Sequence, residues 1–328
     1  MGLFKKKREP SPVEGSRLYF ASDIHGAEVL WRKFLSAGRV YGADTLIMGG
    51  DVTGKVVVPV VSSPEGGWTA DIYGDEQRAT TEGELAALED RIRNSGLYPH
   101  HMTAEEVEEV GRMDEDQRES WFAEVMLQTF RRWLDLADER LSGTGVRCLM
   151  MPGNDDPPGV DRTIEEAAYV EACDDRIVEV GEFAMVSLGW SNRTPFDSPR
   201  ELEEPELFDR VSRLADQVED ADRCIFNLHV PPYDSRLDTA PELDEELNVV
   251  MSGSEPKLIP VGSTAVRELI ERYQPVLSLH GHVHESPGAT TIGRTVSINP
   301  GSDYHTGRIA GCLINLAPGR VQHQFVTG

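Results

Sequence analysis

Short apolar runs alternate with amphipathic segments along the chain from about residue 17 onward. Runs rich in Val, Ile, Leu and Phe are typical of buried strands, and apolar residues at three- and four-residue spacing predict helices. A helix is predicted over about 27–37. The predicted strands are 18–21, 45–48, 146–150, 183–188, 224–228, 276–279, 289–292, 295–298, 309–316 and 322–326. Strands that alternate with helices, followed by a strand-rich end, predict a layered α/β domain.

A long segment at about 56–145 interrupts this alternation. Residues 56–61 and 69–73 predict a strand pair around a turn at 64–67. Capping boxes are predicted at two helix starts, formed by Thr81 with Glu84 and by Thr103 with Glu106. The longest helix is predicted at about 116–140, and its apolar stripe, which we expect to be core, is Phe122, Met126, Phe130, Trp133, Ala137 and Leu141.

The chain is expected to be one domain over residues 15–328, with the 56–145 segment as an inserted subdomain of a hairpin plus helices. Residues 1–14 are expected to be a disordered basic tail. The charges from Lys5 to Arg8 could touch an anionic membrane surface, but a solvated tail is the simpler interpretation of such a run. No apolar run of the roughly 18 residues that span a bilayer is present, and nothing resembles a secretory signal.

The formal net charge of −25 makes binding to duplex nucleic acid unlikely, because such binding depends on Lys and Arg contacts with phosphates. It does not exclude a small phosphate ester, since bound metal ions can reverse the local field. The cysteines form no paired motif, and three of them lie in or beside predicted strands. Buried free thiols indicate a reducing compartment, so a cytoplasmic protein is expected.

Five short polar segments each follow a predicted strand, where layered α/β folds bind their ligands. They are Asp23-Ile24-His25, Gly49-Gly50-Asp51, Gly153-Asn154-Asp155-Asp156, Asn227-Leu228-His229 and His280-Gly281-His282-Val283-His284. Residues i and i+2 point the same way in extended backbone, so Asp23 and His25 should converge, as should His282 and His284. Mixed oxygen and imidazole donors suit Mn, Fe, Zn or Co better than Mg or Ca. Any one segment alone is commonplace, and it is their combination that predicts a metal site.

The order of these segments resembles the calcineurin-like metallophosphoesterases, and within them the Icc-related predicted phosphoesterases. The resemblance runs from Arg17 to about Ser302, includes the turn Asn299-Pro300-Gly301-Ser302, and leaves out the 56–145 segment. It implies a four-layer αββα sandwich of two mixed β-sheets flanked by helices.

The resemblance also implies two adjacent transition-metal ions, with Mn or Fe expected and Zn, Co or Ni as alternatives. By motif position, the first ion would be held by Asp23, His25, Asp51 and His284. The second would be held by Asn154, His229 and His282, with Asp51 bridging both. A metal-bridging hydroxide would attack the phosphorus of a small phosphodiester or phosphomonoester. The diester is slightly favoured, because relatives of the Icc type include cyclic-nucleotide phosphodiesterases.

The candidate catalytic residues are therefore Asp51, Asn154 and Asp155, and Asp155 departs from the related motif, which usually has His there. The substrate could have a leaving group that needs little protonation. Asp155 could instead share a proton with Asp156, although nearby cations would oppose this. Alternatively, another residue could supply the proton, and the candidates are His100, His101, Tyr233 and His305.

Four residues are candidates for substrate binding, namely His100, His101, Tyr233 and Ser263. A solvated loop is the simpler interpretation of His100 and His101. Ser263 or Thr264 is expected to cap a helix, and free amides at a helix start could hold a phosphate oxygen. His280 could orient a metal ligand or simply end a strand.

Two further interpretations stay open. Some related proteins keep the sandwich, lose metal ligands and serve as assembly scaffolds, so a silent binding module is the alternative to an enzyme. The complete ligand set in this chain favours the enzyme. The inserted segment could also form a homodimer interface that narrows substrate choice.

Overall fold

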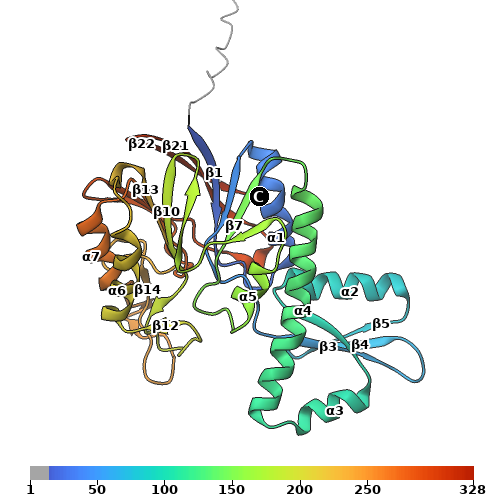
Figure 1. Cartoon of the computed structure of the whole chain (residues 1–328). Helices are drawn as coiled ribbons and strands as arrows, with labels where there is room; N and C mark the ends of the chain where they lie inside the picture. The colour runs from blue at the N-terminus through green and yellow to red at the C-terminus, as the bar shows by residue number, and fades with distance from the viewer. Residues whose placement is uncertain (1–14) are drawn as a thin grey trace, which may run out of the picture.

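Two six-stranded mixed sheets form the centre of the computed structural model, which describes residues 15–328 (Figure 1). The predicted tail at 1–14 lies outside the described residues. The first sheet has the order β22 (Arg320–Thr327), β21 (Ala310–Ala317), β1 (Ser16–Ala21), β2 (Thr45–Met48), β7 (Arg147–Met150) and β8 (Val170–Ala172). The second has the order β19 (Gly288–Ile292), β20 (Thr295–Asn299), β18 (Leu277–Leu279), β13 (Cys224–Leu228), β10 (Phe183–Leu188) and β9 (Arg176–Val180).

The inner faces of the two sheets pack against each other. Leu18, Phe20 and Ile47 of the first sheet lie in one buried cluster with Met185 and Ile225 of the second. The central strands are parallel, as β1 is to β2 and β2 to β7 in the first sheet. Strands buried on both faces consist of continuous apolar runs, which is why the sequence pattern located them.

Helices cover the outer faces of both sheets. Trp31 and Phe34 on one helix pack with Phe130 and Trp133 on another over the first sheet. The helices are α1 (Glu28–Tyr41), α2 (Glu82–Asn94), α3 (Ala104–Arg112), α4 (Glu115–Leu141), α5 (Val160–Glu165), α6 (Glu204–Ala215) and α7 (Thr264–Tyr273). α1, α4 and α5 lie on the first sheet, and α6 and α7 on the second. The predicted four-layer αββα sandwich is confirmed.

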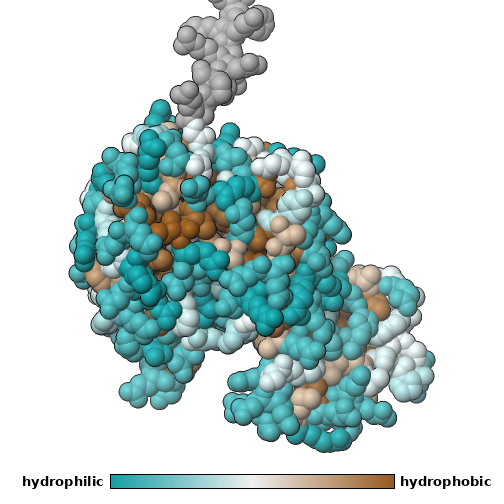
Figure 2. All heavy atoms as spheres, viewed as in Figure 1, coloured by the Kyte–Doolittle hydropathy of each residue, from teal (hydrophilic) through white to brown (hydrophobic). Residues whose placement is uncertain are grey.

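The segment between β2 and β7 projects from the layered body (Figures 1 and 2). It holds a four-stranded sheet in the order β5 (Asp75–Ala79), β4 (Trp68–Ile72), β3 (Val57–Ser62) and β6 (Tyr98–Met102). The predicted hairpin is β3 with β4, which pair antiparallel. The predicted stripe on α4 is core, because its residues lie in or against the main apolar cluster of the first sheet. α4 thus ties this segment to the layered body.

Two details of this segment differ from prediction. Glu84 accepts a hydrogen bond from the backbone N–H of Thr80 rather than Thr81, so only one half of that capping box forms. The box of Thr103 and Glu106 is complete. His100 and His101 lie on β6 and not in a loop, because β6 pairs in parallel with β3.

An arm of short strands extends from the second sheet between β13 and α7. In it, β14 (Thr239–Pro241) pairs with β17 (Leu258–Pro260), and β15 (Met251–Ser252) with β16 (Glu255–Pro256). A third small pair joins β11 (Ser191–Asn192) to β12 (Glu201–Leu202). Short 3-10 turns lie at Ala221–Arg223 and Tyr304–Thr306.

The four cysteines are buried and free, as predicted; they are Cys148, Cys173, Cys224 and Cys312. Burial raises the pKa of the Cys148 thiol well above its ordinary value. Among residues 15–328, no helix is both long enough and apolar enough to cross a lipid bilayer.

Candidate metal centre

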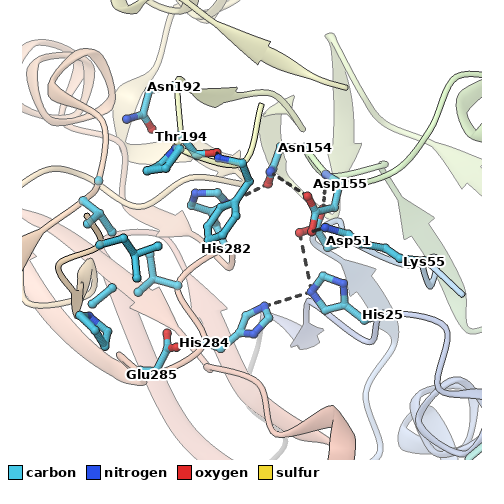
Figure 3. Close-up of a pocket in the computed structure, with 18 of the residues that line it drawn as sticks. His25, Asp51, Lys55, Asn154, Asp155, Asn192, Thr194, His282, His284 and Glu285 are labelled. Carbon is cyan, nitrogen blue, oxygen red and sulfur yellow. Dashed lines mark hydrogen bonds and ion pairs between the residues drawn. The ribbon is translucent and has the colours of Figure 1, made fainter. Parts of the chain in front are cut away.

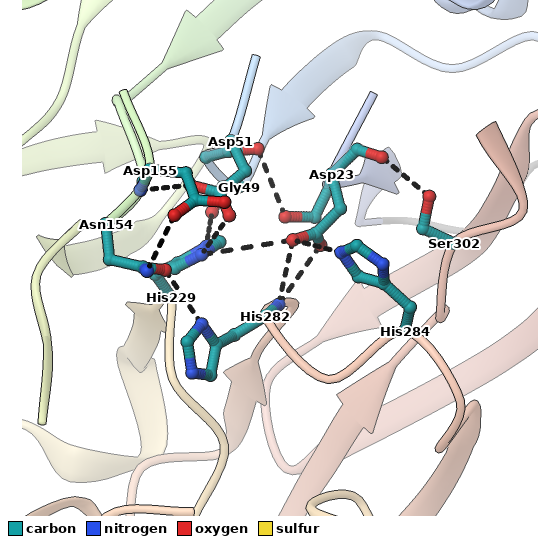
Figure 4. Close-up of polar contacts among 12 residues, drawn as sticks. Asp23, Gly49, Asp51, Asn154, Asp155, His229, His282, His284 and Ser302 are labelled. Carbon is teal, nitrogen blue, oxygen red and sulfur yellow. Dashed lines mark hydrogen bonds and ion pairs between the residues drawn. The ribbon is translucent and has the colours of Figure 1, made fainter. Parts of the chain in front are cut away.

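The five polar segments meet at one edge of the sandwich, where β1, β2, β7, β13 and β18 end (Figure 4). Parallel strands bring their carboxyl ends to the same edge, so segments far apart in sequence become neighbours. Three groups of side chains have ligand atoms within 4.8 Å of one another. They are Asp23 with His25 and His284, Asp51 with His229 and His282, and His25 with Asp51 and Asp155.

The side chains of the first group converge, so that their ligand atoms lie close together. The Nε2 atoms of His25 and His284 lie 3.0 Å apart, and His284 Nε2 lies 3.4 Å from Asp23 Oδ1. His25 Nε2 is also 3.8 Å from Asp51 Oδ2, so Asp51 lies between the first group and the second. Carboxylate and imidazole groups at these separations could share a cation.

The second group contains the most deeply buried histidine of the site. His229 Nε2 lies 3.3 Å from Asp51 Oδ2, and His229 is fully buried. Asn154 belongs to the same cluster, since its Oδ1 lies 2.7 Å from His282 Nδ1. The seven residues predicted as metal ligands are thus brought together.

The backbone at this edge is left-handed rather than extended. Asp23, His25, Asp51 and His282 have φ values of 58°, 40°, 49° and 66°. Non-glycine residues seldom adopt such values, and each costs roughly 1–3 kcal/mol. The predicted convergence of Asp23 with His25 is therefore correct, but the physical reason is a turn and not strand alternation.

Hydrogen bonds between loops hold these turns. The N–H of Asp23 donates to the carbonyl of Gly50, and that of His25 to the carbonyl of Asp51, both at 3.0 Å. Gly153 is required by close approach, since a Cβ there would lie 2.1 Å from Asp51 Oδ1. The loops after β1, β2 and β7 consequently form one connected unit.

Charge coupling is strong at the centre. Burial raises the pKa of the Asp51 carboxyl, but the imidazoles of His229, His25 and His282 together lower it more, and the net pKa lies well below its ordinary range. Burial lowers the pKa of His229, yet Asp51 and then Asp23 raise it to about 10. Burial lowers the pKa of His282 to about 4, so that imidazole is neutral at pH 7 and has a lone pair available for a metal.

Neighbouring groups, which belong to the same polar segments, orient the ligands. His229 Nδ1 contacts the carbonyl of Gly49 at 2.8 Å, which directs Nε2 at the carboxylates. His280 Nδ1 lies 2.8 and 3.0 Å from the carbonyls of Leu228 and Val230, the two residues that flank His229. Of the two interpretations of His280, the orienting role fits these contacts.

The Asn299–Ser302 turn supports the first group. The Ser302 hydroxyl donates to the carbonyl of Asp23 at 2.6 Å, and the Ser302 N–H donates to the carbonyl of His284 at 3.3 Å. Asn299 is fully buried and donates to the carbonyl of Val283. This turn is part of the family resemblance noted in the sequence. Its contacts give it a structural role, because they fix the backbone of Asp23 and of the His282–His284 segment.

Asp155 and Asp156 have separate environments. Asp156 is fully buried among backbone donors, whereas the Asp155 carboxylate pairs with Lys55 at 2.6 Å and accepts from the Ser198 hydroxyl at 2.6 Å. An ammonium partner stabilises the anionic carboxylate. A proton shared between Asp155 and Asp156 is inconsistent with these contacts. Lys55 and Ser198 were not predicted, because neither lies in a motif.

A cavity of about 870 Å³ opens over the centre (Figure 3). His25, Asp51, Lys55, Asn154 and Asp155 line one side of it. The arm supplies an apolar wall, which we call the arm wall, and its residues are Ala240, Pro241, Leu243, Val249, Ile259, Pro260 and Val261. A pocket of this size, polar at one end and apolar at the other, suits a small organic ligand.

Of the four residues predicted to bind substrate, Tyr233 lines the cavity and the other three do not. Ser263 caps α7 as predicted, but it is buried and donates to Glu204. Glu204 also accepts from the N–H groups of Thr264 and Ala265, so this helix start has no amides free for phosphate.

The remaining histidine candidates lie outside the cavity lining. His101 pairs with Glu89, and His100 contacts the ring of Trp121 on α4. His305 contacts the ring of Tyr304 in a tilted arrangement, and Tyr304 does line the cavity. None of the three is placed to donate a proton at the metal centre.

Comparisons with known proteins support the fold. No family model matches the chain. An uncharacterized protein of Methanocaldococcus jannaschii, MJ1162, is 29% identical over 158 residues, which is 47% of this chain and 64% of that protein. The match therefore spans less than two thirds of the relative's own length.

Two solved structures align over nearly the whole chain. One crystal structure covers 94% of this chain and 98% of its own, with 16% identity and a TM-score of 0.54. The crystal structure of TT1561 of Thermus thermophilus covers 94% and 98%, with 12% identity and a TM-score of 0.50. At these identities the likeness is one of fold. Their alignment over nearly the whole chain supports the layered α/β fold that the sequence predicted.

Proposed function

We propose that the protein is a metal-dependent phosphoesterase that hydrolyses a small phosphate ester at this centre. The observation that carries the proposal is that the buried Nε2 atom of His229 is unpaired among the described residues. This atom faces the carboxylates of Asp51 and Asp23 at 3.3 and 3.9 Å. A buried polar atom without a partner is costly, and a cation between it and the carboxylates would remove that cost.

The donor set fits transition-metal ions. Asp23, His25 and His284 would hold one ion, Asn154, His229 and His282 a second, and Asp51 would bridge them. When bound, such a pair of ions would lower the pKa of a shared water and offset charge on phosphoryl oxygens. The protein itself holds these ligands in fixed positions, and its cavity lets the ester reach them. Hydroxide would attack phosphorus in line with the departing oxygen.

Finer features belong to the same proposal. Mn or Fe is expected, because four imidazoles suit these ions better than Mg or Ca. A phosphodiester is slightly favoured over a phosphomonoester, since the histidine that would assist a poor leaving group is replaced by Asp155. A homodimer through the 56–145 segment is a further expectation, and native mass spectrometry of the chain with and without that segment would test it.

The decisive experiment uses chelator-stripped protein refilled with Mn. Hydrolysis of bis-p-nitrophenyl phosphate and p-nitrophenyl phosphate is measured beside an Asp51→Asn control. Metal-dependent turnover that disappears in the control is the expected result, and the ratio of the two rates compares diester with monoester. Protein that binds no metal by elemental analysis would overturn the proposal.

A silent metal-binding scaffold is the competing function. It predicts two bound metals and no turnover of any phosphate ester. The open cavity of about 870 Å³ over the ligands favours the enzyme, because a scaffold has no need for an access path to its metals.

A further inference from the structure

We propose that Lys55, held in position by Asp155, binds the phosphoryl group of the substrate. This inference rests on the proposed function for the identity of the ligand. It also explains why a carboxylate stands in the Gly-Asn-Asp-Asp segment, where the related motif usually has a histidine.

Lys55 lines the cavity, and in the close-up it lies next to Asp51 and Asp155 (Figure 3). Its Nζ lies 2.6 Å from Asp155 Oδ2, and its side chain is 59% exposed while that of Asp155 is 15% exposed. An ammonium group has three donors, and the pair with Asp155 uses one of them. The others are free to reach an oxygen of a phosphoryl group in the cavity.

Asp155 is itself fixed by neighbours on two sides. The Ser198 hydroxyl donates to its Oδ1 at 2.6 Å, and Ser198 is buried. The N–H of Asp155 donates to Asp51 Oδ1 at 2.9 Å. Lys55 is therefore linked through Asp155 to Asp51, the proposed bridging ligand. The ion pair with Asp155 also restricts the rotamers of a lysine side chain that would otherwise move freely in solvent.

Few positively charged side chains in the described part of the chain line the cavity, so Lys55 is a main candidate for binding an anion there. Among the described residues that line the cavity, the lysine and arginine side chains are Lys55 and Arg193. Arg193 lies near Glu203 and Asp197, at 3.1 and 3.7 Å. The chain has a net charge of −25, which repels a phosphate group. Near the metal ligands, Lys55 is the cationic side chain in the cavity lining that could attract it.

A rival role for Asp155 is metal binding, since its carboxylate lies within 4.8 Å of ligand atoms of His25 and Asp51. The two roles differ in what a substitution changes. Removing a ligand lowers metal content, whereas removing the partner of Lys55 leaves metal content unchanged and weakens phosphate binding.

The test measures binding of inorganic phosphate to Mn-loaded protein by isothermal titration calorimetry, with metal content by elemental analysis. Lys55→Gln is expected to raise the phosphate Kd roughly tenfold or more, since it removes a charge-assisted hydrogen bond. Asp155→Asn and Ser198→Ala should raise it less, and Lys55→Arg should retain most of the affinity. The matched control is Lys257→Gln, which removes the same charge from a half-exposed lysine that pairs with Glu242 outside the cavity lining.

Unchanged phosphate affinity in Lys55→Gln, at full metal content, would overturn the inference. Loss of Mn in Asp155→Asn would overturn the positioning role and make Asp155 a ligand. If phosphate binds in a Lys55-dependent way but no ester is turned over, the inference stands and the proposed hydrolase fails. In active enzyme, Lys55→Gln should raise KM by a similar factor, and Lys257→Gln should leave KM unchanged.

Discussion

At the scale of single residues, Asp156 connects the loops that carry the candidate metal ligands. Its buried carboxylate accepts from the N–H groups of Val52, Thr53 and Gly153 at 3.1, 2.8 and 2.8 Å. It also accepts from the Thr53 hydroxyl at 2.6 Å. These donors belong to the loops after β2 and β7, so one carboxylate fixes the two loops relative to each other.

Asp156→Ala is therefore expected to lower the free energy of unfolding by about 3 kcal/mol or more, because several buried donors lose their acceptor at once. Urea denaturation followed by circular dichroism measures this loss. Asp135→Ala, an exposed position on α4, serves as the control and should change stability little. A loss below about 1 kcal/mol for Asp156→Ala would show that the loops are held by other contacts.

Single-residue predictions succeeded where a residue type and its position after a strand carried the signal. The seven predicted ligands form one cluster for that reason. Lys55 and Ser198 could not be found in this way, since they approach Asp155 only after folding, from 100 and 43 residues away. The left-handed turns at Asp23 and Asp51 were missed because nothing in a short motif distinguishes them from extended backbone.

At the scale of elements, the buried strands of the two central sheets were predictable, whereas some exposed strands, such as β5, were not. β2, β10 and β13 have the predicted bounds, because their apolar runs are buried on both faces. β5 consists of Asp75-Glu76-Gln77-Arg78-Ala79 and has no apolar alternation. It is a strand because it pairs with β4, a contact that the sequence pattern does not show. β6 was interpreted as a loop for the same reason, with Pro99 and two histidines in it.

The arm is the element that should set the choice of ester. Leu243 and Ile259 belong to the arm wall, so an apolar leaving group could pack on them. Leu243→Ser with Ile259→Ser should raise KM for a naphthyl phosphate ester about 5- to 30-fold, from a loss of roughly 1–2 kcal/mol of apolar contact. The KM of a methyl ester should stay nearly unchanged, since a methyl group has little apolar surface to pack on the arm wall.

Steady-state kinetics with the two esters measure this difference. Leu258→Ser is the matched control, because Leu258 is exposed on the same arm and does not line the cavity. Equal rises in KM for both esters would indicate a disturbed metal centre rather than a lost apolar contact.

At the scale of the whole molecule, charge links the metal centre to stability. The chain carries a net charge of −25, and within it Asp23 and Asp51 are buried close to one another and to the partly buried Asp155. Carboxylates gathered in this way repel one another at low dielectric. Imidazoles offset part of this repulsion, and bound cations would offset more of it.

Metal ions should therefore stabilise the folded chain strongly. Mn in hundredfold excess over its Kd is expected to add about 2.7 kcal/mol to the free energy of unfolding, because the unfolded chain has no such site. Differential scanning calorimetry should show a rise in Tm of a few degrees on adding Mn to chelator-stripped protein. Ca should raise Tm less, since it favours oxygen ligands and most of the donors here are imidazoles. In Asp51→Asn the rise should shrink sharply, because the proposed bridge between the two ion positions is weakened. An equal Tm with and without Mn would mean that the buried carboxylates are satisfied by imidazoles alone, and it would remove the stabilising role proposed for the metals.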